Sequence, residues 1–375
     1  MTAAAEVVLH GRTDRLVHLH RIPAKAPRYG TWPHWADPEV VAAYRRRGID
    51  RPWTHQVEAA EAAWAGRHVV LATATGSGKS LAAWLPALSA IRAPVTGTRI
   101  SSLRRRPSAL YLSPTKALAA DQLHALEGLL SDGAIRDVRA STCDGDTPLP
   151  ERDWAREHAD IVLTNPDFVH YAMLGAHRRW DRLLRGLRYV VVDECHAYRG
   201  VFGAHVSLVL RRLLRIAEHY GATPQVIMTS ATTGDPAATA ERMLGVPPGQ
   251  IHAVVDDGAP AGQRTIALWQ PAPAETPWSA DKDTDDDEGP RRAALAEVSD
   301  RLTDLIRAGH RTLAFVGSRL GTEVVADHTR KALAADAAGP GPAAVAAYRG
   351  GYLPEERRVL EHRLRTGDLL GLAST

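Results

Sequence analysis

The chain has 375 residues, 45% of them hydrophobic and 24% charged, which suits a soluble folded protein with room for two domains. It has no apolar run near the roughly 20 residues that cross a bilayer and no secretory leader, so we expect no membrane partner and a cytoplasmic location. A net charge of +3 does not by itself indicate nucleic acid, and two cysteines without CxxC spacing argue against a disulfide framework or a cysteine metal site.

The first 257 residues divide into a lead-in and a series of buried strands. Residues 1–50 are expected to form a partly helical lead-in. Beyond it, helical stretches separate five short apolar runs, which span residues 68–74, 108–114, 160–166, 189–195 and 225–231. Each run is continuously apolar rather than alternating, as is typical of strands buried on both faces of a parallel sheet. We therefore predict an α/β lobe over residues 51–257.

A second series of strands begins near residue 264. The expected strands span residues 264–270, 311–317, 344–350 and 369–375. A segment rich in proline and aspartate, at about 271–291, is interpreted as a solvated loop, although its carboxylates leave a divalent-metal role open. Residues 255–263 are expected to be a hinge. The fold prediction is thus two α/β lobes with parallel sheets flanked by helices, the second over residues 264–375.

The strongest local signal is the run ATATGSGKS at residues 72–80, where a strand passes into a glycine-rich loop and then a helix. Such a loop points backbone N–H groups at phosphate oxygens, and the helix dipole adds to the attraction. We expect Lys79, one of only five lysines among 46 basic residues, to reach the β- and γ-phosphates, and Ser80 to bind Mg²⁺. Thr73 replaces the usual first glycine, and a turn that binds nothing is the alternative. The predicted phosphate-binding residues are Thr75, Gly76, Ser77, Gly78, Lys79 and Ser80.

A second signal is VVVDECH, in which two carboxylates follow a buried strand. Adjacent ionised carboxylates at a strand end are costly unless a cation or hydrogen-bond donors satisfy them. We expect Asp193 to hold Mg²⁺ through water, Glu194 to activate the attacking water, and His196 to belong to the same catalytic group. A polar turn without chemistry is the alternative, and the phosphate loop about 115 residues earlier makes it the weaker one.

These motifs resemble those of superfamily 2 helicases of the DEAD/DEAH-box type. The chain has DECH, then the run SAT at Ser230, Ala231 and Thr232, and upstream RPWTHQVEA at 51–59. The resemblance implies two RecA-like lobes, the second incomplete, that use ATP and Mg²⁺. It assigns adenine recognition to Gln56 and coupling between nucleotide and nucleic acid to Ser230 and Thr232.

Further runs resemble the nucleic-acid-binding motifs of these helicases. The runs SPTKALAADQ (113–122), LTNPD (163–167), FVGSR (315–319) and YRGGYLPEERR (348–358) occur in the expected order. The resemblance nominates six contact residues, which are Thr115, Lys116, Asn165, Ser318, Arg319 and Arg349. For the last of these, a capped surface helix is an equally good interpretation. Contacts to the sugar-phosphate backbone would make binding salt-dependent and largely independent of sequence.

The strings THQVEA, PTKALAADQ, DGDTP and DECHAYRGVFGAHV are similar to the bacterial mitomycin-repair helicase family and its RecQ-like repair relatives. That resemblance implies a 3′→5′ DNA translocase, associated with the nucleoid, on single-stranded or tailed DNA. The family's four-cysteine C-terminal domain has no counterpart here. Residues 317–375 also lack a QxxGRxGR-like run that would supply transition-state arginines, so we expect nucleotide binding with poor hydrolysis.

The sequence therefore leaves three functions open. The first is the N-terminal motor portion of a DNA helicase, with Thr375 as the first residue of a motif that continues in relatives. The second is an RNA helicase. The third is a hydrolysis-deficient protein that binds nucleic acid in a nucleotide-dependent way.

Overall fold

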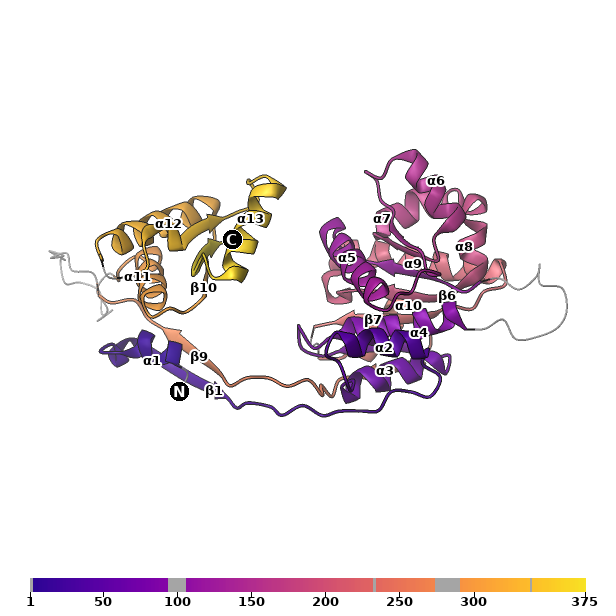
Figure 1. The fold of residues 1–375 in the computed structure, drawn as a ribbon, viewed down its shortest axis with the longest axis horizontal. Coiled ribbons are helices and arrows are strands. Elements are labelled where there is room, and N and C mark those ends of the chain that lie inside the picture. Colours follow the sequence, from indigo (N-terminus) through magenta and orange to yellow (C-terminus); the bar gives the residue numbers. More distant parts are fainter. Residues whose placement is uncertain (1–2, 94–105, 232–233, 274–290, 338) are drawn as a thin grey trace, which may run out of the picture. The chain divides into compact units, whose positions relative to one another are not determined.

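A computed structural model describes residues 3–93, 106–231, 234–273, 291–337 and 339–375. The chain forms two compact units, one over residues 26–261 and the other from residues 1–25 together with 262–375 (Figure 1). The segment expected as a single lead-in over residues 1–50 is therefore divided between the two units. The expected coupling residue Thr232 and most of the proline- and aspartate-rich segment lie outside the described residues.

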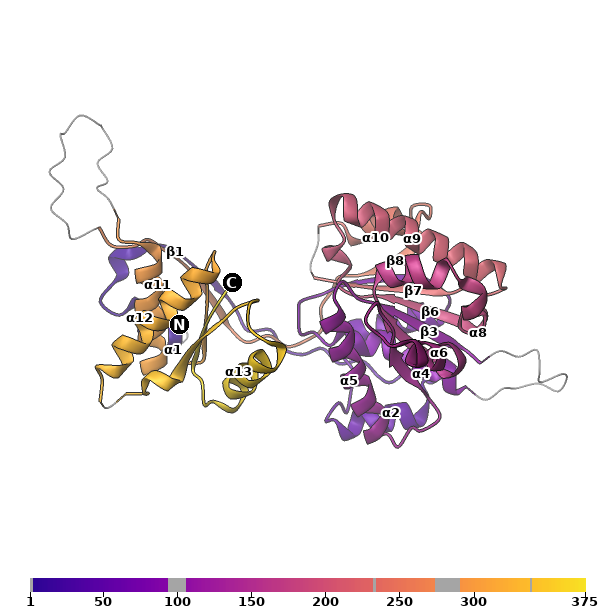
Figure 2. The ribbon, with the colours of Figure 1, turned by 90° about the horizontal axis from the view of Figure 1, so that it is seen from above.

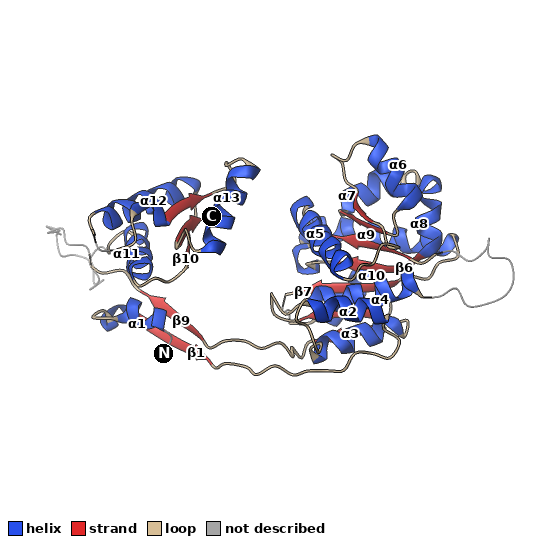
Figure 3. Ribbon diagram, in the orientation of Figure 1, coloured by secondary structure: helices blue, strands red, loops and turns tan. Residues whose placement is uncertain are grey.

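The unit of residues 26–261 is built on a seven-stranded parallel sheet (Figure 3). Its strands are β2 (His68–Ala72), β3 (Ser108–Leu112), β4 (Ala140–Thr142), β5 (Ile161–Thr164), β6 (Leu187–Val192), β7 (Gln225–Ser230) and β8 (Ile251–Val254). Their order in the sheet is β4-β5-β3-β6-β7-β2-β8. The five apolar runs seen in the sequence form the interior strands, which confirms the predicted α/β class. The sequence did not indicate β4 and β8, which lie at the two edges, where a strand needs less apolar surface.

Helices cover both faces of this sheet, as the view from above shows (Figure 2). They are α2 (Pro38–Arg46), α3 (Thr54–Trp64), α4 (Lys79–Arg92), α5 (Lys116–Asp132), α6 (Leu149–His158), α7 (Pro166–Phe168), α8 (Asp181–Gly186), α9 (Gly200–His219) and α10 (Pro236–Leu244). Between them lie a π-helix, η3 (Val169–Leu174), and two short 3-10 helices, η4 (His177–Trp180) and η5 (Cys195–Ala197).

Successive strand residues point to opposite faces, and they sort into two cores. Val69, Tyr111 and Val191 pack with α2, α3, α4 and α5, whereas Val70 and Val192 pack with α8, α9 and α10. Because all seven strands are parallel, their carboxyl ends meet at a single edge of the sheet.

The other unit contains a three-stranded parallel sheet of order β10-β12-β11, made of β10 (Thr312–Phe315), β11 (Val345–Tyr348) and β12 (Gly371–Ser374). Helices α11 (Ala294–Arg307) and α12 (Arg319–Ala334) pack on one face, and α13 (Pro354–Thr366) packs on the other. The remaining elements are α1 (Ala3–Leu9), η1 (Thr13–Arg15), β1 (Leu16–Ile22), β9 (Arg264–Trp269) and η6 (Pro342–Ala344).

The expectation that residues 264–270 start this parallel sheet is wrong. They form β9, which pairs antiparallel with β1 in a separate two-stranded ribbon. Most residues of β9 are exposed, including Ile266 and Leu268, so this strand is not the doubly buried strand that its apolar composition suggested. Residues 1–25 thus provide the hydrogen-bonding partner of a strand that comes more than 240 residues later.

Buried charges also fix the N-terminal segment to this unit. Glu297 on α11 is buried, and its carboxylate accepts hydrogen bonds from Arg15 at 3.1 Å, from the indole of Trp269 at 2.9 Å and from Arg301 at 3.1 Å. Arg12 pairs with Asp304 at 2.9 Å. Buried carboxylates are tolerated when several donors satisfy them, so this network ties α1 and β1 to α11. Within the described residues, no helix is both long and apolar enough to span a membrane.

Candidate nucleotide and nucleic-acid site

The phosphate loop joins β2 to α4 at the carboxyl edge of the seven-stranded sheet. Gly76 and Gly78 have φ angles of +80° and +66°, which glycine adopts without strain. A Cβ atom on Gly78 would also lie 2.5 Å from the Gln56 side-chain nitrogen. The loop is closed by a 2.7 Å hydrogen bond between the hydroxyls of Thr73 and Ser77. Thr73, which departs from the usual glycine, therefore has a structural role in holding the loop.

Lys79 and Ser80 are the first two residues of α4. The Lys79 ammonium donates to the carbonyl oxygens of Thr73 at 3.1 Å and Ala74 at 3.0 Å, so its charge lies inside the loop. Burial lowers the Lys79 pKa, and the nearby carboxylates of Glu194, Asp193 and Asp257 act in the opposite direction. The ammonium therefore lies within the loop that is predicted to bind phosphate, and the exposed Ser80 follows it in the chain.

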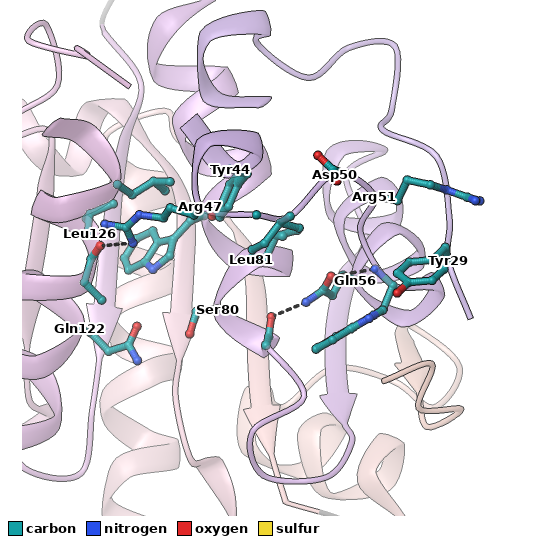
Figure 4. Close-up of a pocket in the computed structure, with 17 residues that line it drawn as sticks. Tyr29, Tyr44, Arg47, Asp50, Arg51, Gln56, Ser80, Leu81, Gln122 and Leu126 are labelled. Carbon is teal, nitrogen blue, oxygen red and sulfur yellow. Dashed lines mark hydrogen bonds between the residues drawn. The ribbon is translucent and has the colours of Figure 1, made fainter. Parts of the chain in front are cut away.

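Gln56 lies beside this loop, on the first turn of α3. Its side-chain oxygen accepts from the Trp53 N–H at 2.9 Å, and its nitrogen donates to the Gly78 carbonyl at 2.9 Å. Figure 4 shows these two bonds at one side of a cavity of about 590 Å³, which Gln56, Ser80 and Tyr29 help to line. The side chain predicted to read adenine therefore faces a cavity next to the loop, and its amide already bridges α3 and the loop.

Asp193 follows β6, between the ends of β3 and β7. The Tyr111 and Thr229 hydroxyls each donate a hydrogen bond to its carboxylate, one to each oxygen. Tyr111 belongs to β3 and Thr229 to β7, so each neighbouring strand contributes one donor. Sequence reasoning missed both residues, because a tyrosine or threonine within a buried strand resembles ordinary core packing.

Glu194 and His196 lie beside this carboxylate. Glu194 has a φ angle of +48°, an uncommon backbone conformation for a residue other than glycine. The His196 Nδ1 atom lies 3.1 Å from a Glu194 oxygen and 3.2 Å from the Ala231 nitrogen. The Nδ1 atom cannot make both contacts as hydrogen bonds at once. It accepts from the Ala231 N–H when it is unprotonated, and it donates to Glu194 when it is protonated. His196 thus touches the motif that contains Ser230, which is buried at the end of β7.

Three predicted nucleic-acid contacts lie on the same edge of the sheet, where two of them cap helices. The Thr115 hydroxyl accepts from the Leu118 N–H at 3.2 Å, and the Asn165 side chain accepts from the Phe168 N–H at 2.9 Å. Lys116 is exposed and pairs with Asp146, which lies in the run DGDTP. Both side chains that cap helices thereby fix the ends of loops on the predicted binding edge.

The other three predicted contacts belong to the second unit. Ser318 caps α12 by accepting from the Gly321 N–H at 3.0 Å, and the exposed Arg319 follows it. Arg349 pairs with Glu323 at 2.8 Å and lies over the Tyr352 ring, 4.8 Å from its centroid. The Arg349 side chain is therefore already engaged within its own unit.

The donor set fits a magnesium ion bound together with a nucleotide. Within the described residues, no group of three His, Cys, Asp or Glu side chains could hold a metal by itself. Mg²⁺ commonly binds through one or two protein oxygens plus substrate phosphates and water. Ser80 and Asp193 are the residues that would hold it here.

Sequence reasoning also missed the contacts of His55 and Asp257. The buried His55 ring accepts from the Gly258 N–H at 3.0 Å, so its other nitrogen carries a proton and donates to the Ser77 carbonyl at 2.9 Å. Asp257 accepts from the Ala74 N–H at 3.2 Å. The segment expected to be a hinge is thus bonded to the phosphate loop directly through Asp257 and indirectly through the His55 ring. No short motif marks such contacts.

A glycine-rich loop, its lysine and a carboxylate pair that meet at the edge of a parallel sheet define a P-loop protein of the RecA-like kind. The profile of the DEAD/DEAH box helicase family matches residues 53–240, which shows that the chain belongs to this family. That range includes the phosphate loop, DECH and SAT.

Similar proteins agree with this assignment. The ATP-dependent helicase YprA of Bacillus subtilis is 37% identical over 362 residues, which cover 96% of this chain and 45% of the relative. The crystal structure of the DUF1998 helicase MrfA bound to DNA has a TM-score of 0.86 and 35% identity, covering 100% of this chain and 49% of that one. MrfA bound to DNA and AMPPNP has a TM-score of 0.85 and 35% identity, over 99% of this chain and 48% of that one. The chain thus spans about half the length of these proteins.

Proposed function

We propose that this chain is the motor portion of an ATP-dependent helicase or translocase that acts on DNA. The observation that carries the proposal is the joining of Lys79, Asp193 and Glu194 at one edge of the sheet. The similarity to MrfA, a helicase whose structures contain DNA and AMPPNP, supports DNA and ATP as the ligands. Movement in the 3′→5′ direction, a place in DNA repair and a nucleoid-associated cytoplasmic location belong to the same proposal and rest on resemblance.

In this proposal each residue has a defined task. Lys79 and the loop amides bind the β- and γ-phosphates, and Gln56 faces the base. Ser80 and Asp193 hold Mg²⁺, which would neutralise phosphate charge during transfer. Glu194 accepts a proton from the attacking water. His196 contacts both Glu194 and Ala231, so it would transmit a change in the position of Glu194 to the end of β7, which contains Ser230.

The test compares nucleotide binding, nucleic-acid binding and hydrolysis in the same preparation. We expect a fluorescent ATP analogue to bind in the presence of Mg²⁺, and AMPPNP to change the affinity for single-stranded DNA, as linkage between the two sites requires. Absence of nucleotide binding would overturn the proposal. Stronger stimulation of the ATPase by single-stranded RNA than by DNA would instead select an RNA helicase.

The third alternative has its own signature. A chain whose affinity for DNA depends on nucleotide but which hydrolyses ATP no faster than its Glu194→Gln variant would be a nucleotide-gated binding protein.

A further inference from the structure

Asp193 is held by a hydroxyl from the strand on each side of it. Asp193 continues β6 on the face that carries Val191, and Val191 pairs with Tyr111 on β3. Since Val192 pairs with Met228, Asp193 lies opposite Thr229 on β7. Tyr111, Asp193 and Thr229 therefore share one face of the sheet, the face covered by α4. Cross-strand neighbours of this kind lie within reach of a tyrosine side chain.

We propose that Tyr111 and Thr229 are positioning residues of the magnesium–nucleotide site. We further propose that Tyr111 couples magnesium affinity to the position of β3, the strand that leads to the predicted nucleic-acid contacts Thr115 and Lys116. This inference rests on the proposed function of the site. Neither residue would touch the nucleotide, since both act by setting the orientation of the Asp193 carboxylate.

The Tyr111 ring is fixed on several sides. It is 2% exposed and stacks on Trp84 of α4, with ring centroids 5.4 Å apart and planes inclined by 23°. A tyrosine hydroxyl carries its proton at neutral pH, so it is a donor to Asp193. The ring therefore joins the helix that follows the phosphate loop to the carboxylate that follows β6.

The Thr229 hydroxyl has two tasks. It donates to Asp193 and accepts from the Glu194 N–H at 3.3 Å. An ionised carboxylate offers about four lone-pair positions, so two hydroxyl donors leave acceptor capacity for water molecules bound to Mg²⁺. Partners that orient a metal-binding residue typically account for about 10–100-fold in metal affinity or activity.

Tyr111 also connects this carboxylate to the binding edge. Four residues later, Thr115 caps α5, whose first residue is Lys116. Between them, the Leu112 carbonyl accepts from the Asp193 N–H at 2.8 Å, and the Ser113 hydroxyl donates to the Thr115 carbonyl at 2.7 Å. A shift of the start of α5 when nucleic acid binds would thus be transmitted to the end of β3. Tyr111 would carry this shift to Asp193.

The test measures the Mg²⁺ concentration for half-maximal binding of a fluorescent ADP, with and without single-stranded DNA, in the full chain. For Tyr111→Phe we expect this concentration to rise about 10–100-fold, with Mg²⁺-free nucleotide affinity within about twofold of wild type. The shift that DNA causes in this Mg²⁺ concentration, the Mg²⁺ midpoint, should disappear. Thr229→Val should weaken Mg²⁺ binding similarly, and Thr229→Ser, which keeps the hydroxyl, should restore it.

Tyr198→Phe is the matched control. The Tyr198 hydroxyl is also buried near Asp193, but in the described part of the chain it makes no hydrogen bond. Its removal should leave the Mg²⁺ midpoint unchanged. An unchanged midpoint in Tyr111→Phe would overturn the inference, as would an equal loss of Mg²⁺-free binding accompanied by a lower Tm, which would assign the hydroxyl to folding. Wild-type protein that binds no nucleotide would instead refute the proposed function.

Discussion

Replacing Lys79 by alanine should remove most nucleotide binding. The Lys79 ammonium has partners within the chain, the Thr73 and Ala74 carbonyls at 3.1 and 3.0 Å, so phosphate binding would exchange one set of contacts for another. A unit charge about 4 Å from a phosphate charge contributes about 4 kcal/mol at an effective dielectric constant of about 20. Subtracting the two hydrogen bonds that are given up, at about 0.5–1 kcal/mol each, leaves about 2–3 kcal/mol, which corresponds to roughly 30- to 150-fold weaker binding.

Lys116 provides the matched control, because it is a lysine at the start of a helix on the same sheet edge. Equilibrium titrations with a fluorescent ATP analogue and with labelled single-stranded DNA would be made on both variants. Lys116→Ala should bind nucleotide normally and DNA more weakly, with the slope of log affinity against log salt reduced by about 1. Lys79→Ala that binds nucleotide within threefold of wild type, with an unchanged Tm, would refute the reasoning.

Three further results are expected. Glu194→Gln should bind ATP with near wild-type affinity, while single-turnover hydrolysis falls by about 10²–10⁴, because the amide cannot accept the proton. Gly258→Ala should lower the Tm by several degrees in thermal unfolding, since the new Cβ would lie 2.3 Å from the Thr54 hydroxyl and overpacking costs about 1–3 kcal/mol. Gly262→Ala should leave the Tm unchanged, because its Cβ would meet nothing within 4 Å among the described residues. Burial lowers the pKa of His68 in the folded chain. The unfolded chain therefore binds the proton first, and the stability that the neutral His68 ring contributes is lost as the pH falls below about 6.5. The Tm difference between pH 7.5 and pH 5.5 should be smaller in His68→Gln than in the wild type.

The sequence predicts the position of the phosphate loop and of the carboxylate pair because each is encoded in a short contiguous run. A strand, a glycine-rich turn and a lysine must follow one another to bind phosphate, and the run from residue 72 to 80 has that order. The same is true of DECH, where the strand and its carboxylates are adjacent. The interior strands of the seven-stranded sheet are equally clear, since burial on both faces demands continuous apolar residues.

Contacts between distant residues could not be read in this way. Tyr111 lies 82 residues before Asp193, and nothing in its local sequence distinguishes it from a core tyrosine. The same is true of His55, whose ring meets Gly258 203 residues later. The prediction for β9 was wrong for a related reason, because a strand's apolar composition reveals neither its partner strand nor the number of its faces that are buried.

The two units are joined by two stretches of chain rather than one, since the boundaries fall after Lys25 and after Ala261. These stretches meet at the start of α3, where the Arg28 N–H donates to the Gly258 carbonyl at 2.8 Å and the Thr54 N–H donates to the Arg28 carbonyl at 2.9 Å. A single cleavage after Gly258 would place β1 in one fragment and β9 in the other. The fragments would stay associated through the ribbon and the Arg12–Asp304 and Arg15–Glu297 pairs. Shortening the chain from its N-terminus, by contrast, would damage the unit that contains its C-terminus.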